Sequence, residues 1–347
     1  MNVRKKIKQL GIENIECINK ADKELLSKGV ANILTSSFRN ARLNKQDIEK
    51  KLIETDMYVA TIPKNLPRVN YLYFNSALYF DRNINLKELN EDILHECIHK
   101  LQEYKKRKRI IQLGICNFTD TKIIGFGINE AAINYIIMNA INSKKRTIKL
   151  YGMEVPENIE NYYSIVTNLI QQIVYLIGDE VLIDSTLNCN DEFIYNCIDN
   201  FGESAFVEIR DNFDKILSIN NNIYKIIKEN KQNNELKSYI NNLTDIYINT
   251  QELILISYFK LLLVRINQLK EVEVFKEKIE GISKYVGRIK NYNFYEKFKE
   301  IQLTRLKEKE EEIKRMTSLM VITNNPIKKV YNLIRRIFIK ENIKVDV

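Results

Sequence analysis

Hydrophobic residues recur at helical spacing along residues 21–55 of the chain. The period then changes, because residues 57–62 form a short apolar run that stops at a proline, which is typical of a strand. Two runs rich in Tyr, Phe and Leu follow at residues 69–74 and 77–80, on either side of a turn-like Asn-Ser pair. They predict a β-hairpin, which is the only concentrated β signal in the chain.

The next patterns predict two neighbouring helices. The first begins near Asn85 and carries an apolar stripe. The residues of that stripe are Leu86, Leu89, Ile93, Cys97, Leu101 and Tyr104. After an irregular, glycine-containing stretch at residues 110–128, Asn129 is placed to cap a second helix that runs to about Asn142. Because this second helix is apolar nearly all round, we expect it to lie at the centre of the protein.

Helical periodicity dominates the chain beyond Tyr151. Pro156 at a first turn and Gly178 just past a last turn bracket one strongly periodic helix. Further helices are predicted at residues 191–200, 203–229, 236–248, 252–268, 274–285 and 295–316. The whole pattern predicts an α+β protein that is predominantly α.

Composition supports a globular, mostly helical protein. The 347 residues are 45% hydrophobic and include only ten Gly and four Pro, which argues against a disordered or all-β chain. The first twenty residues lack the long apolar run of a secretion signal, and the longest apolar stretch, residues 253–266, is broken by Lys260 and falls short of a membrane span. Five scattered cysteines fit free thiols, so we expect a cytoplasmic protein.

The net charge of +9 favours acidic partners, but it is concentrated in only two places. Residues 105–109 are all basic and follow the first helix, where they fit a solvated helix end or, alternatively, a phosphate- or substrate-facing patch. A second basic segment begins at Asn325-Pro326 and predicts an amphipathic helix that either contacts an anionic membrane or packs on the body of the protein. We find no nucleic-acid-binding motif and expect no nucleic-acid partner.

Both histidines of the chain lie in the first helix, at His95 and His99. Residues four apart share a helix face, so the two imidazoles can reach one cation. Glu96 lies beside that face, where a carboxylate can take a proton from a metal-bound water, as in His-Glu-x-x-His zinc peptidases. The alternative is an ordinary solvated helix that matches the motif by chance.

A catalytic zinc site usually has three protein ligands. No third histidine exists, so the remaining ligand is a carboxylate or a thiolate. Glu130 is the best candidate, because it lies at the start of the second helix behind a glycine-containing turn; its alternative role is an acid that interacts with the helix dipole. Cys116 is a remote alternative ligand, whereas Cys97 faces away from the histidines and reads as a core residue.

The two segments His95 to His99 and Asn129 to Ala131 resemble the gluzincins, the thermolysin-like superfamily of zinc peptidases. The resemblance covers about a third of the chain and implies a zincin-like core in which Zn²⁺ is held by His95, His99 and Glu130, with Glu96 as general base. It also implies that the hairpin, through residues 77–80, forms the edge along which an extended peptide binds.

Two positions depart from the family pattern. Asn134 stands where the family commonly has an acid that orients the first metal-binding histidine, and an amide supplies no charge there. The family also needs a donor for the developing oxyanion. Because no histidine remains, this donor must be a tyrosine, and Tyr151 is favoured over Tyr162 and Tyr163.

The sequence thus predicts a zinc metallopeptidase that hydrolyses a peptide or protein substrate. The expected parts are a metal-binding core at residues 1–150, a helical lobe at 151–316 and a basic amphipathic tail at 317–347. Two other classes stay open: a catalytically inactive, zinc-binding helical interaction protein, and a protein associated with a membrane surface.

Overall fold

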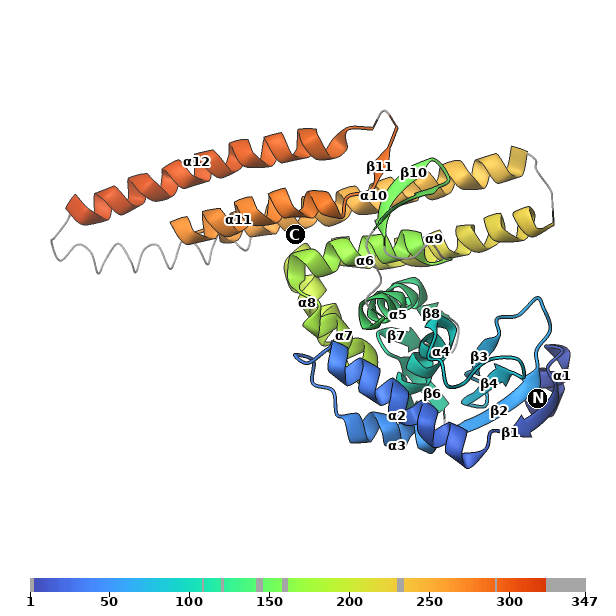
Figure 1. The fold of residues 1–347 in the computed structure, drawn as a ribbon. Helices are drawn as coiled ribbons and strands as arrows, with labels where there is room; N and C mark the ends of the chain where they lie inside the picture. The colour runs from blue at the N-terminus through green and yellow to red at the C-terminus, as the bar shows by residue number, and fades with distance from the viewer. Residues whose placement is uncertain are drawn as a thin grey trace. The chain divides into compact units, whose positions relative to one another are not determined.

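The computed structural model (Figure 1) describes residues 3–107, 109–119, 122–141, 146–157, 162–229, 234–290 and 292–322, with side chains to residue 317. Within these ranges the chain is mixed α/β and mostly helical, which confirms the predicted fold class. The helices are α1 (Val3–Gln9), α2 (Lys20–Ser37), α3 (Lys45–Ile53), α4 (Glu91–Leu101), α5 (Phe126–Ala140), α6 (Ser164–Ile177), α7 (Glu180–Asn188), α8 (Glu192–Phe201), α9 (Glu203–Lys228), α10 (Asn234–Arg265), α11 (Leu269–Gly281) and α12 (Phe294–Ile322).

Three small sheets accompany the helices. The strands are β1 (Glu13–Cys17), β2 (Asp56–Thr61), β3 (Val69–Leu72), β4 (Ala77–Asp81), β5 (Glu103–Lys106), β6 (Arg109–Leu113), β7 (Cys116–Phe118), β8 (Ile123–Ile124), β9 (Arg146–Leu150), β10 (Met153–Glu157) and β11 (Arg288–Ile289). Contacts divide the chain into a first unit, Met1–Tyr258 with Ile282–Tyr292, and a second unit, Phe259–Gly281 with Asn293–Val347.

The first sheet contains the predicted hairpin. Its order is β1-β2-β4-β3, with β3 and β4 antiparallel and β2 and β4 parallel. The expectation that residues 77–80 form the exposed edge is wrong, because β4 lies between two strands and β3 is the edge. All four residues 77–80 are buried, and a continuous apolar run of this kind is typical of a strand covered on both faces.

Helix α4 packs against β3 and β4 on one side and against α5 on another. It begins at Glu91 and not near Asn85, because the Asn90 side chain accepts a hydrogen bond from the N–H of Ile93 at 3.0 Å and caps the helix. The helix ends at Leu101, so Tyr104 belongs to β5 and is exposed, in contrast to the predicted stripe. The predicted core positions Ile93, Cys97 and Leu101 are buried.

A four-stranded sheet, β5-β6-β7-β8, lies between helices α4 and α5 in the chain and was not predicted from the sequence. Of the basic run, Lys105 and Lys106 lie in β5 and Arg109 lies in β6, so these residues are in paired strands and not at a helix end. The stretch predicted to be irregular holds strands of two to five residues, with Gly114 (φ +56°) between β6 and β7 and Gly125 (φ +78°) between β8 and α5. Strands of two or three residues such as β7 and β8 carry too few alternations to give a periodic signal.

Helix α5 begins earlier than predicted, after the left-handed Gly125. Asn129 consequently lies inside the helix and does not cap it. Its side chain accepts from the backbone N–H of Ile115 at 3.2 Å and bonds the Gln102 amide at 3.2 Å. The helix start is capped by Asp214 of α9, whose carboxylate accepts from the backbone N–H groups of Gly125 (3.1 Å) and Gly127 (2.5 Å).

The region after Tyr151 is less uniformly helical than predicted. Pro156 lies in β10, which pairs with β9 and, through Met153 and Glu154 alone, with β11. Because β11 does not extend as far as Pro156, no strand on the β11 side of β10 needs a hydrogen bond from the N–H that proline lacks. The periodic helix starts only at Ser164, and α7 was not predicted. The predicted helices at 191–200 and 203–229 are confirmed as α8 and α9.

Helix α10 joins two segments that were predicted as separate helices. Two of the three polar residues between them are buried, since Thr250 is 0% and Gln251 2% exposed. The Thr250 hydroxyl donates to the carbonyl of Ile246 at 2.6 Å, and the Gln251 side chain accepts from the backbone N–H of Gly287 at 2.7 Å. Because these polar side chains are hydrogen-bonded, the helix can continue through a polar segment at which the sequence predicts a break.

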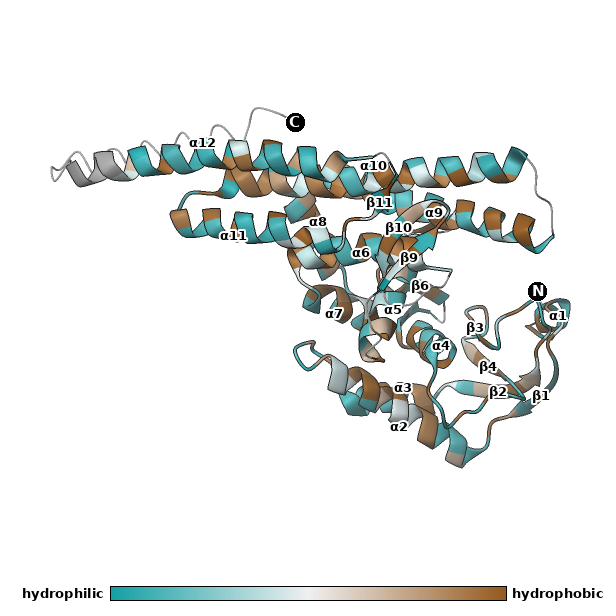
Figure 2. Cartoon of the chain, turned by 45° about the horizontal axis from the view of Figure 1, so that its top comes forward, coloured by the Kyte–Doolittle hydropathy of each residue, from teal (hydrophilic) through white to brown (hydrophobic). Residues whose placement is uncertain are grey.

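The second unit contains α11 and α12, which show alternating hydrophilic and hydrophobic bands (Figure 2). On α12 the buried residues Phe298, Gln302, Leu306 and Ile313 recur on one side of the helix. The Phe259 ring contacts those of Phe275 (5.0 Å) and Phe298 (5.8 Å). The predicted helix from Asn325-Pro326 and most of the predicted tail lie outside the described residues.

No single helix within the described ranges is long and apolar enough to span a membrane. Helices α6 and α7 meet that criterion only as a pair, which is bent by 120° at the break between them.

Candidate metal centre

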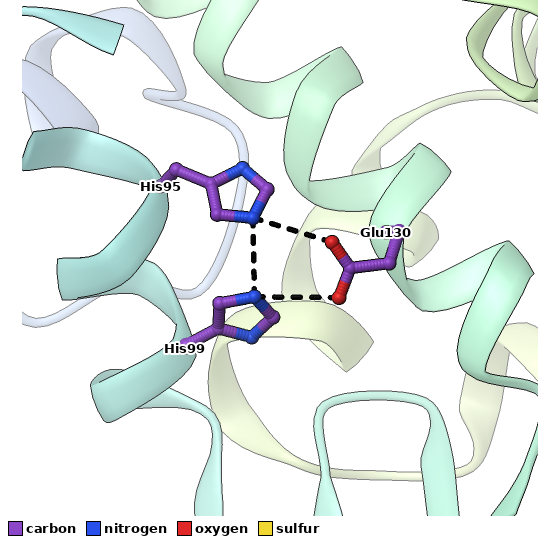
Figure 3. Close-up of side chains that lie close together, drawn as sticks. All are labelled: His95, His99 and Glu130. Carbon is purple, nitrogen blue, oxygen red and sulfur yellow. Dashed lines mark hydrogen bonds and ion pairs between the residues drawn. The ribbon is translucent and has the colours of Figure 1, made fainter. Parts of the chain in front are cut away.

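The His95 and His99 side chains point from α4 toward Glu130 on α5 (Figure 3). The two imidazole Nε2 atoms are 3.1 Å apart. Glu130 approaches both, with Oε2 at 3.2 Å from His95 Nε2 and Oε1 at 3.3 Å from His99 Nε2. The structure therefore brings together the three ligands that the sequence suggested, and this group could hold a metal ion.

The spacing of these atoms fits a small cation. A tetrahedron of ligands at about 2.0–2.1 Å from zinc has edges of about 3.3–3.4 Å, close to the three separations in this site. Glu130 Oε1 is buried, and apart from the 3.3 Å ion-pair contact with His99 Nε2 it has no hydrogen-bond partner among the described residues. Such an orphaned carboxylate oxygen is costly unless a cation or a donor satisfies it. The donor set of two imidazoles and one carboxylate suits zinc.

Burial and charge prepare the ligands for metal binding. Only 13% of the His95 side chain, 11% of His99 and 2% of Glu130 is exposed, so all three ligand candidates are largely buried. Burial lowers the pKa of His99 to about 4, so its ring is neutral and offers a lone pair. Burial opposes ionisation of Glu130, but the nearby histidines and a hydrogen bond from Tyr163 outweigh it and lower the Glu130 pKa.

His95 is held differently from His99. Burial alone would lower the pKa of His95, but its hydrogen bond to Glu130 and the charge of that carboxylate raise it. The His95 ring is also stacked on the ring of Tyr163, with centroids 5.3 Å apart and planes inclined by 17°. A proton on His95 competes with a metal for the same nitrogen, so metal binding at this site releases protons.

Glu96 follows His95 and is oriented by the edge strand of the first sheet. Its Oε2 atom accepts a hydrogen bond from the backbone N–H of Tyr71 in β3 at 2.7 Å. Burial raises the pKa of Glu96 to about 7, although the nearby His95 charge lowers it in part. A carboxylate with a pKa near neutrality is suited to accept a proton from water.

Of the three candidate tyrosines, Tyr163 is the one that contacts the ligands. Its hydroxyl hydrogen-bonds the Glu130 carboxylate and its ring covers His95. Tyr151, which the sequence favoured, donates from its hydroxyl to Asn220 Oδ1 at 3.1 Å, and Tyr162 donates to the carbonyl of Leu217 at 3.2 Å. The predicted helix from Pro156 obscured Tyr163, because it placed this residue among the positions of a buried stripe.

The structure also shows the surroundings of three other residues named in the sequence analysis, Asn134, Cys97 and Cys116. The Asn134 amide donates to the Thr167 hydroxyl of α6 at 2.8 Å. Cys97 and Cys116 are 0% and 1% exposed, and burial raises the pKa of both thiols. The group whose ligand atoms lie within 4.8 Å of one another consists of His95, His99 and Glu130 and contains neither cysteine.

No protein-family model matches the chain, and no curated protein or solved structure matches it.

Proposed function

We propose that this chain is a zinc-dependent metallopeptidase with a gluzincin-like, zincin-type core. The observation that supports the proposal is the meeting of His95, His99 and Glu130 at zinc-like spacing, with Glu96 beside them. The contacts of helix α4 with the edge strand β3 and with helix α5 support this proposal. The proposed substrate is a peptide or protein, and the free cysteines support a cytoplasmic location.

In this proposal His95 and His99 hold zinc through Nε2, and Glu130 holds it through its carboxylate. Bound zinc would acidify a water molecule and polarise the scissile carbonyl group. Glu96 accepts the proton of the attacking water, and its Oε2 atom is held by the backbone N–H of Tyr71. Tyr163 takes the role assigned to Tyr151 from sequence and donates a hydrogen bond to the carbonyl oxygen as charge develops.

The peptide is proposed to lie along β3. Tyr71 pairs with Leu78 of β4, yet its backbone N–H points to Glu96, so β3 directs main-chain groups toward the site. An extended segment can add to such an edge by main-chain hydrogen bonds. This replaces the edge at residues 77–80, which β3 covers.

Two variants and a metal analysis test the proposal. Purified protein should carry about one zinc per chain, and His95→Ala should lose it because two ligands hold zinc poorly. Glu96→Gln should keep zinc and lose peptide hydrolysis, whereas Glu91→Gln, on the first turn of the same helix, should keep both. Wild-type protein that takes up no zinc on dialysis would refute the metal site. Zinc-loaded protein that cleaves no member of a random peptide library would refute the peptidase.

A zinc-binding interaction protein without activity is the second candidate. The contact that favours it is the hydrogen bond of the Asn134 amide to Thr167, because an uncharged residue there supplies no anionic support to a histidine ligand. Stoichiometric zinc, no peptide cleavage and a stable partner in pull-downs would support this candidate. The same Glu96→Gln comparison decides between the two, since only the peptidase depends on the Glu96 carboxylate.

A further inference from the structure

Tyr71, in the edge strand β3, contacts the candidate centre in three separate ways. Its ring stacks on the ring of His99, with centroids 5.9 Å apart and planes inclined by 19°. Its backbone N–H donates to Glu96 Oε2 at 2.7 Å. Its hydroxyl hydrogen-bonds Glu103, which lies just past the end of α4. One residue of the sheet thus touches a metal ligand, the proposed general base and the carboxylate that follows their helix.

Glu103 is the anchor of this arrangement. Only 6% of its side chain is exposed, and its Oε2 atom is 2.7 Å from the ammonium groups of both Lys100 and Lys105. Its Oε1 atom accepts from the Tyr71 hydroxyl and from the Ser76 hydroxyl in the β3–β4 turn. Lys100 also donates to Ser76 Oγ at 2.6 Å. The end of α4 and the β3–β4 hairpin are therefore tied together through one buried carboxylate.

We propose that Tyr71 is the positioning residue of the candidate centre, holding His99 with its ring and Glu96 with its backbone N–H, while its hydroxyl bond to Glu103 keeps β3 in the register where both contacts form. The role at Glu96 rests on the proposed function. The role at His99 requires only metal binding.

The strand register explains why the hydroxyl contact matters. Successive side chains of a strand point to opposite faces of the sheet. If β3 slipped by one residue against β4, the Tyr71 side chain would therefore turn to the other face, away from His99. On an edge strand only one neighbouring strand fixes the register, and β3 has four residues. The bond from the Tyr71 hydroxyl to Glu103 supplies a second fixed point on the side of α4.

The first experiment measures metal affinity and needs no substrate. Zn²⁺ binding to the full chain is followed by chelator competition, and the Co²⁺-loaded forms are compared by visible absorption. Tyr71→Leu, which removes the ring, should weaken Zn²⁺ binding about tenfold, as loss of groups that orient metal ligands commonly does, and should change the Co²⁺ spectrum. Tyr71→Phe retains the ring but loses the hydroxyl bond that holds β3 in register, so it should weaken Zn²⁺ binding by less than Tyr71→Leu does.

Tyr79→Phe is the matched control. Tyr79 is a buried tyrosine of the adjacent strand β4, 2% exposed, and it belongs to the apolar cluster with Ile7, Ile12 and Ala60 and not to the cluster that contains α4. Its hydroxyl accepts a hydrogen bond from Asn75 at 2.8 Å. Tyr79→Phe therefore removes a buried hydroxyl from the same sheet without touching the centre, and metal affinity, spectrum and kcat should be those of wild type.

The second experiment separates positioning from folding with a fluorescence-quenched peptide that the wild type cleaves. Tyr71→Phe and Glu103→Ala, which remove the donor and the acceptor of the bond, should each lower kcat about tenfold or more while Zn²⁺ stays bound, because the register of β3 and the direction of Glu96 are lost. Since both changes remove the same bond, the double variant should lose little more than either single variant.

Unchanged zinc affinity and Co²⁺ spectrum in Tyr71→Leu would overturn the role at His99. Fully additive losses of kcat in the double variant, or an equal loss in Tyr79→Phe, would overturn the role of the Glu103 bond. If zinc-loaded wild type cleaves no peptide, the proposed peptidase and the role at Glu96 both fail. The role at His99 is then decided by the metal measurements alone.

Discussion

Tyr163 and Tyr151 lie twelve positions apart in the sequence but have different surroundings in the structure. We therefore expect their substitution by Phe to affect kcat differently. Tyr163→Phe keeps the ring on His95 and removes the hydroxyl near Glu130, so metal content should be unchanged while kcat falls about a hundredfold, as for loss of an oxyanion donor. Tyr151→Phe breaks only the bond to Asn220 and should leave kcat near that of wild type.

Zinc content and kcat of the two purified variants check this expectation. A loss of kcat in Tyr151→Phe with full activity in Tyr163→Phe would restore the tyrosine favoured from sequence.

Glu103 gives a pH-dependent contribution to stability. Burial raises its pKa, but hydrogen bonds from Lys100, Lys105, Ser76 and Tyr71 outweigh burial and lower the Glu103 pKa in the folded protein. A lowered folded pKa means that the stabilisation is complete above the unfolded pKa of about 4.3 and is lost as the pH falls toward the folded pKa. Glu103→Gln should therefore destabilise the protein by about 2 kcal/mol at pH 7.

The measurement is denaturant unfolding of metal-free wild type and Glu103→Gln across pH. The difference in unfolding free energy should be constant near neutrality and should shrink below about pH 4.3. A difference that does not change with pH would show that the charge of Glu103 contributes nothing.

At the residue scale, the pair His95 and His99 with Glu96 was readable from sequence because both histidines of the chain fall in one helical turn. Glu130 was readable because it leads a second apolar helix. Tyr71 and Glu103 were not readable, since their roles come from contacts across 25 and 32 positions of the chain. Neither residue belongs to a local pattern.

At the scale of elements, the start of α5 decides where Glu130 lies. The chain turns at Gly125, and a Cβ at Gly127 would lie 2.4 Å from the backbone of Phe213 on α9. Gly127→Ala should therefore cost about 2 kcal/mol, typical of overpacking against rigid backbone, and should weaken zinc binding because Glu130 is carried on the same turn.

Gly29→Ala is the matched control for this change. Gly29 also lies within a helix, α2, but an added Cβ there meets only the flexible end of Leu89, at 2.8 Å. We expect a smaller effect on unfolding free energy and none on zinc affinity. Equal losses in both variants would mean that the approach of α5 to α9 does not control the site.

The amphipathic helices α8 and α9 were predicted because each carries several turns of its pattern, and the hairpin β3–β4 was predicted because Tyr, Phe and Leu are concentrated in it. The strands β7 and β8 escaped prediction because they have only three and two residues, whereas β5 and β6 match β3 and β4 in length but carry Lys and Arg in place of most of the aromatic residues. Helix boundaries were wrong where a capping group came from elsewhere, as with Asp214 at α5, which lies 87 to 89 positions away.

At the scale of the whole molecule, every ligand and every contact residue of the centre belongs to the first unit. Zinc should bind the folded form of this unit and not the unfolded chain, in which α4 and α5 no longer bring the ligands together. At a free zinc concentration of one hundred times the dissociation constant, folding should gain about 2.7 kcal/mol.

Thermal unfolding with zinc, with a chelator and with Mg²⁺ checks this expectation. Zinc should raise Tm, and Mg²⁺ should not, because it prefers oxygen ligands over imidazole. The rise should disappear in His95→Ala. A rise that survives in this variant would place the effect at some other site.

The sequence by itself determined a mostly helical α+β chain and the nearest-neighbour geometry of His95, Glu96 and His99, because helical spacing is a local property. Only the tertiary structure decided that Glu130 completes the group, that β3 and not β4 is the edge strand, and that Tyr163 and Tyr71 flank the two imidazoles. These features depend on the pairing and packing of elements far apart in the chain. Such contacts follow from how buried surfaces fit together, which no local pattern of residues encodes.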